Sequence, residues 1–194
     1  MKRLELAKTR LSSYGDEARQ ALALAFAADV VVAAASVATV LVVTDDQRAA
    51  SLLASLGARV VADDPDAGLN PALEHGVELL RESEPALAVA TVSADLPSLL
   101  TPDLVAVLGR VPQDGRGFVS DLAGTGTTLL AAGPGLPLQP TYGSASRARH
   151  LGSGAVELVA PESVRRDVDT PDDLEHAVAL GVGPHTTAVL EEIW

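Results

Sequence analysis

The sequence contains no cysteine, which excludes disulfide bonds, thiolate chemistry and cysteine-ligated metal sites. Aromatic residues make up only 3% of its 194 residues, whereas hydrophobic residues make up 47%. A core of small aliphatic side chains is more typical of strands covered by helices than of a β-sandwich, which usually contains larger aromatic anchors. The length suits one compact domain, so we expect residues 1–194 to form a single domain.

Positive charge is also scarce, because 14 Lys and Arg residues stand against 26 Asp and Glu, for a net charge of −12. Such a surface repels a phosphate backbone, so nucleic-acid binding is not expected. A phosphorylated ligand would need a local positive cluster, backbone N–H groups or a metal ion. No segment has the pattern of a signal peptide, and the apolar runs are too short to span a bilayer or are interrupted by Asp29. We therefore expect a cytoplasmic protein without membrane contact.

Short Val-rich runs alternate with Ala- and Leu-rich segments of helical spacing. Strands are predicted at residues 39–44, 58–62, 87–92, 117–120, 127–131 and 155–159. Helices are predicted at residues 16–35, 46–56 and 71–82, and after Thr101 and Thr170. Gly57 is expected just past the second helix, and Asn70 is expected as the N-cap of the third. The alternation predicts an α/β fold with a three-layer, mostly parallel, doubly wound sheet.

Four positive residues lie within the first ten positions: Lys2, Arg3, Lys8 and Arg10. Placed directly before a helix, Lys8 and Arg10 could neutralise the β- and γ-phosphates of a nucleotide. The alternative interpretation is an ordinary solvated charge cluster at the N-terminus. Position and chemistry alone leave both interpretations open.

Three aspartates are candidates for a metal site. Asp95 follows the third predicted strand, at the sheet edge where α/β folds bind ligands; a turn cap is its alternative role. Asp167 and Asp169 end a stretch expected to be extended, residues 163–168, so both carboxylates could reach one Mg²⁺. A D-x-D pair is weak evidence by itself, because a chain with 15 Asp contains about one by chance. The other such pair, at residues 64–66, is interpreted as surface.

Two glycine-containing segments could bind an anion. The turn at residues 124–127 offers hydroxyl groups and unhindered N–H groups, although it could equally be a simple hairpin turn. Residues 142–150 have the pattern of an anion-binding nest that leads into a helix. Gly68 and Asn70 would suit recognition of a base or ribose. The histidines show no metal-ligand spacing, and no role is predicted for His150.

The order of these motifs resembles the phosphoenolpyruvate and 2-phospho-L-lactate guanylyltransferases of coenzyme F(420) biosynthesis. The resemblance runs from residue 2 to residue 183 and rests on six ordered motifs. They are Lys-Arg-Leu-x-x-Ala-Lys-Thr-Arg-Leu, Gly-Leu-Asn-x-Ala-Leu, Asp-Leu-Pro, Gly-Thr-Gly-Thr, Gly-x-x-Ser-x-x-Arg-His and Asp-Val-Asp-Thr-Pro-x-Asp-Leu.

This resemblance implies a nucleotidyltransferase fold of the GT-A-like kind, dependence on Mg²⁺, and two substrates, GTP and a phosphorylated three-carbon acid. The metal ligands that it implies are Asp95, Asp167 and Asp169. The residues that it assigns to the phosphorylated acid are Thr127, Gly143 and Ser146. Those that it assigns to the nucleotide are Lys8, Arg10, Gly68 and Asn70. The catalytic groups would then be Lys8, Arg10 and Asp95.

Members of that family carry a hydrophobic strand directly before the Lys-Arg-Leu segment, where this chain has only Met1. We therefore expect the usual first strand to be missing because the assigned start lies too far downstream; a truncated, inactive paralogue is the rival explanation.

Phosphoenolpyruvate is the expected acceptor, and 2-phospho-L-lactate and 3-phosphoglycerate are the alternatives. A molybdenum-cofactor-type or sugar nucleotidyltransferase fits less well, because such enzymes typically carry G-x-G-x-R in the first loop. A non-catalytic nucleotide-binding paralogue is the alternative outside enzymes. A homodimer, and hand-off of the product to the next enzyme of the pathway, are left open.

Overall fold

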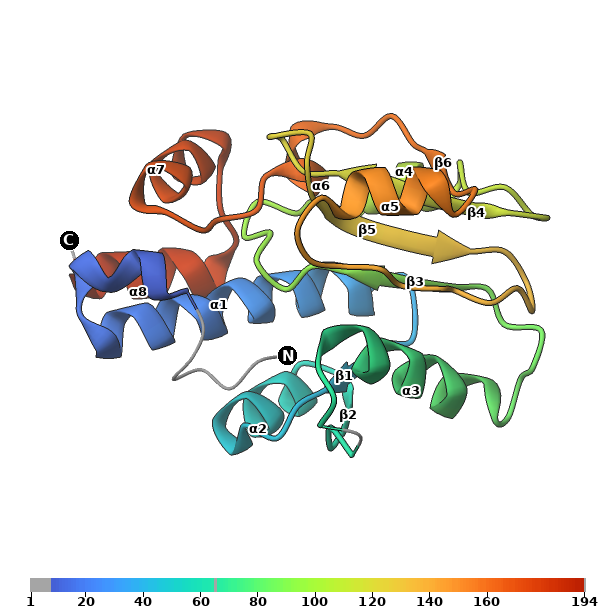
Figure 1. Ribbon diagram of the computed structural model, residues 1–194. Coiled ribbons are helices and arrows are strands. Elements are labelled where there is room, and N and C mark those ends of the chain that lie inside the picture. The colour runs from blue at the N-terminus through green and yellow to red at the C-terminus, as the bar shows by residue number, and fades with distance from the viewer. Residues whose placement is uncertain (1–7, 65, 194) are drawn as a thin grey trace. The chain divides into compact units, whose positions relative to one another are not determined.

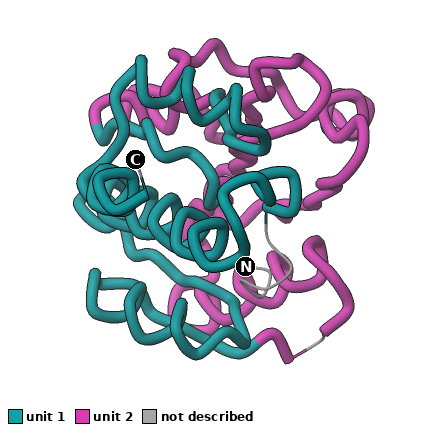
Figure 2. Tube along the Cα trace, turned by 90° about the vertical axis from the view of Figure 1, so that its left-hand side faces the viewer, with its two compact units in different colours: residues 1–62, 94–101, 166–194 teal, residues 63–93, 102–165 magenta. Residues whose placement is uncertain are grey.

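A computed structural model describes residues 8–64 and 66–193 (Figure 1). The basic residues Lys2 and Arg3 lie outside the described residues, and so does the position where a first strand is expected to be missing. The chain forms two compact units (Figure 2). Unit 1 comprises residues 1–62, 94–101 and 166–194, and unit 2 comprises residues 63–93 and 102–165.

Helix α1 (Asp16–Ala35) is the central element of unit 1, and 11 of its 20 residues are buried. By length and composition this helix could cross a membrane, but 61% of its most apolar 18-residue stretch is buried inside the protein. Helix α8 (Pro184–Ile193) packs along it. Buried Asp29 of α1 joins the two helices, because its carboxylate accepts hydrogen bonds from the N–H groups of His185 (3.0 Å) and Thr186 (2.9 Å). These features make α1 a core helix.

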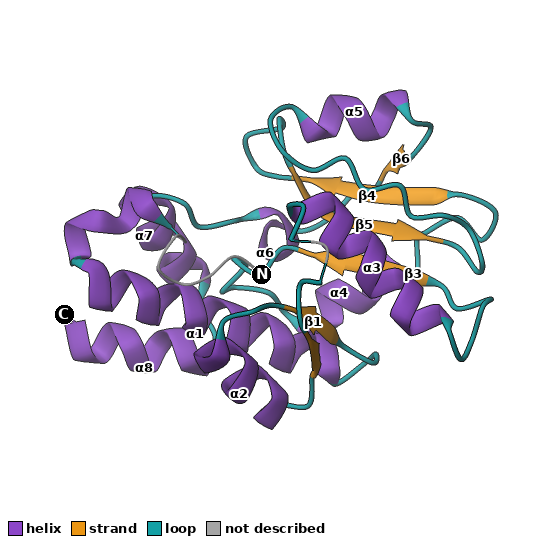
Figure 3. Cartoon of the chain, turned by 60° about the horizontal axis from the view of Figure 1, so that its bottom comes forward, coloured by secondary structure: helices purple, strands orange, loops and turns teal. Residues whose placement is uncertain are grey.

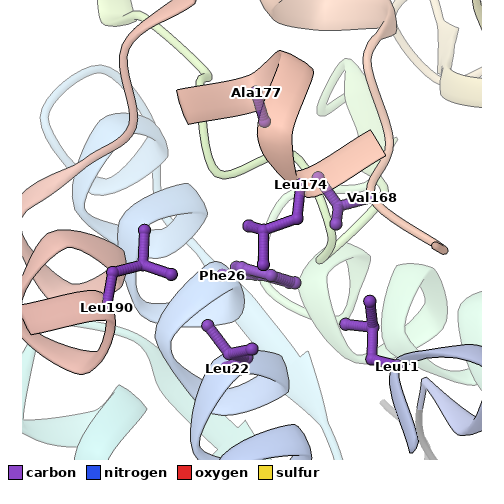
Figure 4. Close-up of a cluster of buried hydrophobic side chains, with 7 residues drawn as sticks. All are labelled: Leu11, Leu22, Phe26, Val168, Leu174, Ala177 and Leu190. Atoms are coloured by element: carbon purple, nitrogen blue, oxygen red, sulfur yellow. The ribbon is translucent and has the colours of Figure 1, made fainter. Parts of the chain in front are cut away.

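One core cluster of unit 1 gathers buried side chains from distant parts of the chain (Figure 4). Its members are Leu11, Leu22, Phe26, Val168, Leu174, Ala177 and Leu190. They come from α1, α7 (Pro171–Leu180), α8, the 3-10 helix η2 (Thr9–Tyr14) and the segment before α7. Helix α7 begins with the predicted cap, a capping box between Thr170 and Asp173. The cluster fixes both η2 and the segment before α7, and these two segments carry site residues.

A second part of unit 1 is a β-α-β arrangement. Strand β1 (Leu41–Val43), helix α2 (Gln47–Ser55) and strand β2 (Arg59–Val61) follow one another, and the two strands pair in parallel. The carboxylate of Asp46 caps α2, and Gly57 follows it with φ +98°, as predicted. Alanines and valines of α1 pack against α2 through a second buried cluster.

Unit 2 contains a four-stranded sheet in the order β3-β5-β4-β6 (Figure 3). Its strands are β3 (Val89–Val92), β4 (Arg116–Ser120), β5 (Thr127–Ala132) and β6 (Val156–Glu157). Its helices are α3 (Leu69–Arg81), α4 (Thr101–Leu108, whose first residue belongs to unit 1), α5 (Ser146–Gly152) and α6 (Glu162–Arg165). All six residues of β5 are buried, because this strand is central and covered on both faces.

The structure confirms the α/β class and all six predicted strands, and it changes three details. The sheet of unit 2 is mixed rather than mostly parallel, because β5 runs antiparallel to both β3 and β4. The stretch 163–168 is not extended throughout, since α6 occupies its first part. The prediction that Asn70 is an N-cap is wrong, because α3 begins at Leu69 and Gly68 (φ +99°) precedes it as the cap residue.

Candidate functional site

Lys8 lies directly before η2 in a left-handed backbone conformation, with φ 51° and ψ 42°. This conformation costs a residue with a side chain roughly 1–2 kcal/mol. Two contacts hold it in place: the Lys8 carbonyl accepts a hydrogen bond from the Leu11 N–H (2.9 Å), and the side chain of Leu11 is fully buried in the core. A strained residue held by its surroundings is a common feature of functional sites.

The Lys8 ammonium group lies between two carboxylates of unit 1. Its Nζ is 2.5 Å from Oδ2 of Asp95 and 2.7 Å from Oδ1 of Asp169. The other oxygen of Asp169 accepts a hydrogen bond from Nη2 of Arg10 at 3.2 Å. Burial opposes the charge of Lys8, but the two carboxylates outweigh it and raise the pKa of Lys8 above its ordinary value. Lys8 is therefore a cation at every physiological pH.

The positions of Asp95 and Asp169 suit a bound cation. Oδ1 of Asp95 is buried and has no hydrogen-bond partner within the described part of the chain. Carboxylate oxygens are the ligands that Mg²⁺ and Ca²⁺ prefer in proteins. The N–H of Val168 donates to the carbonyl of Asp95 (3.0 Å), so the two segments that carry these carboxylates are joined through their backbones. The chemistry of the two carboxylates fits a divalent ion.

Asp167 has a different place from the other two predicted ligands. It is half-buried and precedes Val168, whose side chain lies in the core. Within residues 8–64 and 66–193, no three His, Cys, Asp or Glu side chains are arranged to hold a metal. The structure therefore brings Asp95 and Asp169 together around Lys8 without grouping Asp167 with them.

Two predicted residues of unit 2, Thr127 and Ser146, lie beside a buried histidine. Thr127 begins β5, Ser146 begins α5, and His150 lies four residues later on the same helix. Nδ1 of His150 is 2.9 Å from Oγ1 of Thr127, and the Ser146 hydroxyl donates to the same oxygen at 3.1 Å. The side chains are 7%, 2% and 0% exposed for Thr127, Ser146 and His150. The two hydroxyl groups and the imidazole ring form a buried, hydrogen-bonded cluster.

The tautomer of His150 follows from its second nitrogen. Nε2 accepts a hydrogen bond from the N–H of Thr141 at 3.0 Å, so the proton of the neutral ring is assigned to Nδ1. Burial, together with the positive charges of Arg116 and Arg149, lowers the pKa of His150 to about 4. His150 is therefore neutral at physiological pH and donates to Thr127.

Asn70 and Tyr142 fix the segment that leads to Gly143. The Asn70 side chain accepts from the N–H of Tyr142 (2.8 Å) and donates to its carbonyl (3.2 Å). The hydroxyl of Tyr142 pairs with that of Thr91 at 2.8 Å, and burial raises the pKa of Tyr142. Gly143 follows with φ +117°, a conformation that strongly favours glycine. The predicted site residues Asn70 and Gly143 thus belong to one fixed segment.

The Gly-Thr turn is a hairpin turn rather than an anion cradle. It joins β4 to β5, and the carboxylate of Asp121 accepts the N–H groups of Thr125 and Gly126, both at 2.8 Å. These N–H groups are already bonded and cannot bind a phosphate without displacing Asp121. The hydroxyl groups of the turn, among them that of Thr127 at its end, remain as ligand-binding candidates.

Residues that the sequence left without a role are central to unit 2. His150 was noted only for its position, although the Ser-x-x-Arg-His spacing places His150 and Ser146 four residues apart on one helix face. Tyr142 contacts Asn70, which is distant in sequence, and Asp121 contacts the turn that follows it. No local sequence pattern predicts either contact.

Comparisons with known proteins agree over nearly the whole chain. The family described as "Guanylyl transferase CofC like" matches residues 1–193. The chain is 54% identical to the phosphoenolpyruvate guanylyltransferase of Streptomyces coelicolor over 195 residues, which cover 97% of this chain and 92% of that protein. It is 52% identical to the protein of that name from Thermomonospora curvata over 194 residues, with 97% and 85% covered.

Solved structures show the same fold. A nucleotide-diphospho-sugar transferase from Desulfovibrio desulfuricans matches with a TM-score of 0.70 at 18% identity, covering 96% of this chain and 88% of that one. A nucleotidyl transferase from Methanothermobacter matches with a TM-score of 0.52 at 19% identity, covering 80% and 81%. These likenesses confirm the nucleotidyltransferase fold expected from the sequence.

Proposed function

Since the chain belongs to the guanylyl transferase CofC-like family, we propose that it transfers GMP from GTP to phosphoenolpyruvate and releases pyrophosphate. The observation that carries the proposal is identity above 50% over 97% of the chain to two proteins named phosphoenolpyruvate guanylyltransferase. The expected setting is the cytoplasm and the biosynthesis of coenzyme F(420). The charges and hydroxyl groups described above are the kind that two phosphorylated substrates require.

The proposed reaction is an in-line displacement at the α-phosphorus of GTP. A phosphate oxygen of phosphoenolpyruvate forms a bond to this phosphorus, and the bond to the β-phosphate oxygen breaks. The attacking oxygen is already anionic, so no general base is required. The protein then has two tasks, to orient two polyanions and to reduce the repulsion between them.

Unit 1 carries the groups proposed for the triphosphate. Lys8 and Arg10 supply two positive charges, and the Arg10 side chain is 69% exposed, so its guanidinium group can reach a ligand. Asp95 and Asp169, with Asp167 nearby in sequence, would hold Mg²⁺, which when bound neutralises phosphate charge. The Lys8 ammonium now lies between two of these carboxylates and would have to share or leave that position.

Unit 2 carries the groups proposed for the phosphorylated acid. The Thr127 hydroxyl can donate to a carboxylate or phosphate oxygen, the Ser146 hydroxyl donates to the same Thr127 oxygen, and Gly143 leaves the backbone beside them without a side chain. Gly68 and Asn70 are proposed to lie near the nucleoside. For Asn70 the proposal is indirect, because its amide already bonds the backbone of Tyr142.

The test is release of pyrophosphate by the purified protein with GTP, Mg²⁺ and phosphoenolpyruvate. Parallel reactions replace the acceptor by 2-phospho-L-lactate or 3-phosphoglycerate, and GTP by ATP, CTP or UTP. We expect the largest kcat/KM with GTP and phosphoenolpyruvate, and no release without an acceptor. A preference for another acceptor would contradict the substrate assignment alone. Stabilisation by GTP with Mg²⁺ but no turnover with any acceptor would instead indicate a non-catalytic nucleotide-binding protein.

A further inference from the structure

We propose that His150 is a positioning residue that turns the hydroxyl of Thr127 into an obligatory donor toward the phosphorylated acid. The inference rests on the proposed function, because it concerns the same acceptor. It adds a residue that does not itself touch the substrate.

The first step is the direction of the bond between His150 and Thr127. The N–H of Thr141 can only donate, so Nε2 of His150 must accept and cannot carry a proton. The proton of the neutral ring is then on Nδ1, which donates to Oγ1 of Thr127. An imidazolium would bring its Nε2–H against the N–H of Thr141, two donors face to face, so this contact disfavours the charged ring as well.

The second step is the capacity of the Thr127 hydroxyl. Its oxygen has two lone pairs and one hydrogen. One lone pair accepts from His150 and the other accepts from the Ser146 hydroxyl, so both are used. The hydrogen of Thr127 has no acceptor among residues 8–64 and 66–193. A buried hydroxyl with an unbonded hydrogen is unfavourable, and an anionic oxygen is a strong acceptor for it.

The third step is that the arrangement is fixed before a ligand arrives. His150 is fully buried, and its ring lies 5.3 Å from that of Tyr142 and 5.7 Å from that of Phe118. Its Nε2 partner, Thr141, directly precedes the segment that Asn70 holds. The Thr127 hydrogen is therefore oriented in advance, which reduces the entropy lost when the acceptor binds.

Two substitutions separate this role from simple packing. The amide of His150→Asn can place an N–H donor close to the position of Nδ1 while losing the acceptor for Thr141. The amide of His150→Gln can place an acceptor close to the position of Nε2 while losing the donor to Thr127. Both substitutions replace the imidazole ring by an open amide side chain and remove similar aromatic contacts, so they are a matched pair.

The experiment measures KM for phosphoenolpyruvate, KM for GTP, kcat and Tm for both variants and the wild type. We expect His150→Gln to raise KM for phosphoenolpyruvate about tenfold, the effect of losing one well-made polar contact, while KM for GTP stays within about twofold. His150→Asn should recover most of the lost acceptor affinity. Thr127→Val should raise the same KM, and adding His150→Gln to it should cause little further change, since the two act as a unit.

The outcomes are distinguishable from those that test the proposed function. If the wild type shows no turnover with phosphoenolpyruvate, the proposed function and this inference are both wrong. If the wild type is active and the acceptor KM follows Tm equally in the Asn and Gln variants, His150 is only a packing residue. Additive effects of Thr127→Val and His150→Gln would likewise overturn the inference while leaving the guanylyl transfer intact.

Discussion

Lys8 and Asp95 are 87 positions apart in sequence, and their charged atoms approach to 2.5 Å within unit 1. The side chains are 11% and 27% exposed, and Asp169 lies on the other side of the same ammonium group. A charge that is mostly removed from water needs a partner, and here the Lys8 ammonium lies between two carboxylates, one of which also accepts from Arg10. Removing Lys8 leaves the two carboxylates with only the exposed Arg10 to offset them, whereas removing Asp95 leaves Lys8 with Asp169 as its partner.

Asp95→Asn should abolish pyrophosphate release and leave the protein folded. The neutral amide keeps the size of the side chain but removes one of the two carboxylates that pair with Lys8, which is also a proposed metal ligand. We expect a loss of about 1–3 kcal/mol in the free energy of unfolding, between the values for exposed and buried ion pairs. Urea denaturation and steady-state kinetics measure the two effects.

The control for this variant is Asp64→Asn, which removes a carboxylate of the other D-x-D pair on an exposed part of the chain. It should change neither activity nor stability by more than a small amount. Near-normal turnover in Asp95→Asn would refute the assignment of Asp95 to the reaction.

Lys8→Met should increase the affinity for Mg²⁺ in the absence of nucleotide while reducing turnover. The substitution keeps an unbranched side chain but removes the ammonium group that now lies between Asp95 and Asp169. Two uncompensated carboxylates repel each other and attract a divalent cation. Calorimetric titration of Mg²⁺ into the protein without GTP measures the affinity independently of activity.

An Arg10→Met variant is the comparison for Lys8→Met. Arg10 contacts only Asp169 of this group and is largely exposed, so its removal should increase the repulsion between the carboxylates, and with it the Mg²⁺ affinity, far less than the removal of Lys8 does. Equal Mg²⁺ affinity in the wild type and in Lys8→Met would show that the ammonium group and the metal do not compete for one position.

The long helices were predictable from the sequence because their signals are local. The bounds of α1 match the prediction at residues 16–35, and α7 begins directly after Thr170, as predicted. The direction of β5 was not predictable, because a buried run of apolar residues has the same pattern in parallel and antiparallel strands. The mixed sheet of unit 2 depends on which strands pair, and this is a tertiary property.

In the candidate site, too, some residues were predictable from local sequence and others depend on tertiary contacts. Asp95 was identified from its place after a predicted strand and Asp169 from its place before a capped helix, and the structure brings them together. The pairing of Asn70 with Tyr142 joins residues 72 positions apart, so the local sequence suggested only a cap. His150 was left without a role because its partner Thr127 lies on β5, and the sequence around a helical histidine does not indicate which strand packs beside it.

The low pKa of His150 predicts that stability falls as the pH is lowered from about 6.5 to about 4. In this window the unfolded chain binds a proton at His150 and the folded chain does not, so acid favours unfolding. The loss approaches about 3 kcal/mol at the lower end, at 1.36 kcal/mol per pH unit. Urea denaturation between pH 4 and pH 8 measures the slope.

Carboxylates also titrate in part of this range, so the slope is read as a difference between proteins. His150→Asn should show a smaller loss of stability in acid than the wild type, whereas His176→Asn, at an exposed position of α7, should follow the wild type. Parallel pH curves for the wild type and His150→Asn would contradict a neutral, buried imidazole.

Gly126→Ala should destabilise the hairpin between β4 and β5 by a steric contact rather than by its backbone conformation. A Cβ atom at this position would lie 2.4 Å from Oδ2 of Asp121, the atom that accepts the N–H of Gly126 itself. Either the carboxylate moves and loses both N–H groups, or the turn shifts, and we expect a cost of about 1–3 kcal/mol. Because Thr127 follows directly, KM for phosphoenolpyruvate should rise as well.

Urea denaturation and kinetics measure both effects, and Asp121→Ala provides the background that tests the cause. In that background the obstructing oxygen is absent, so adding Gly126→Ala should cost much less than it does in the wild type. An equal cost in both backgrounds would place the strain elsewhere in the turn.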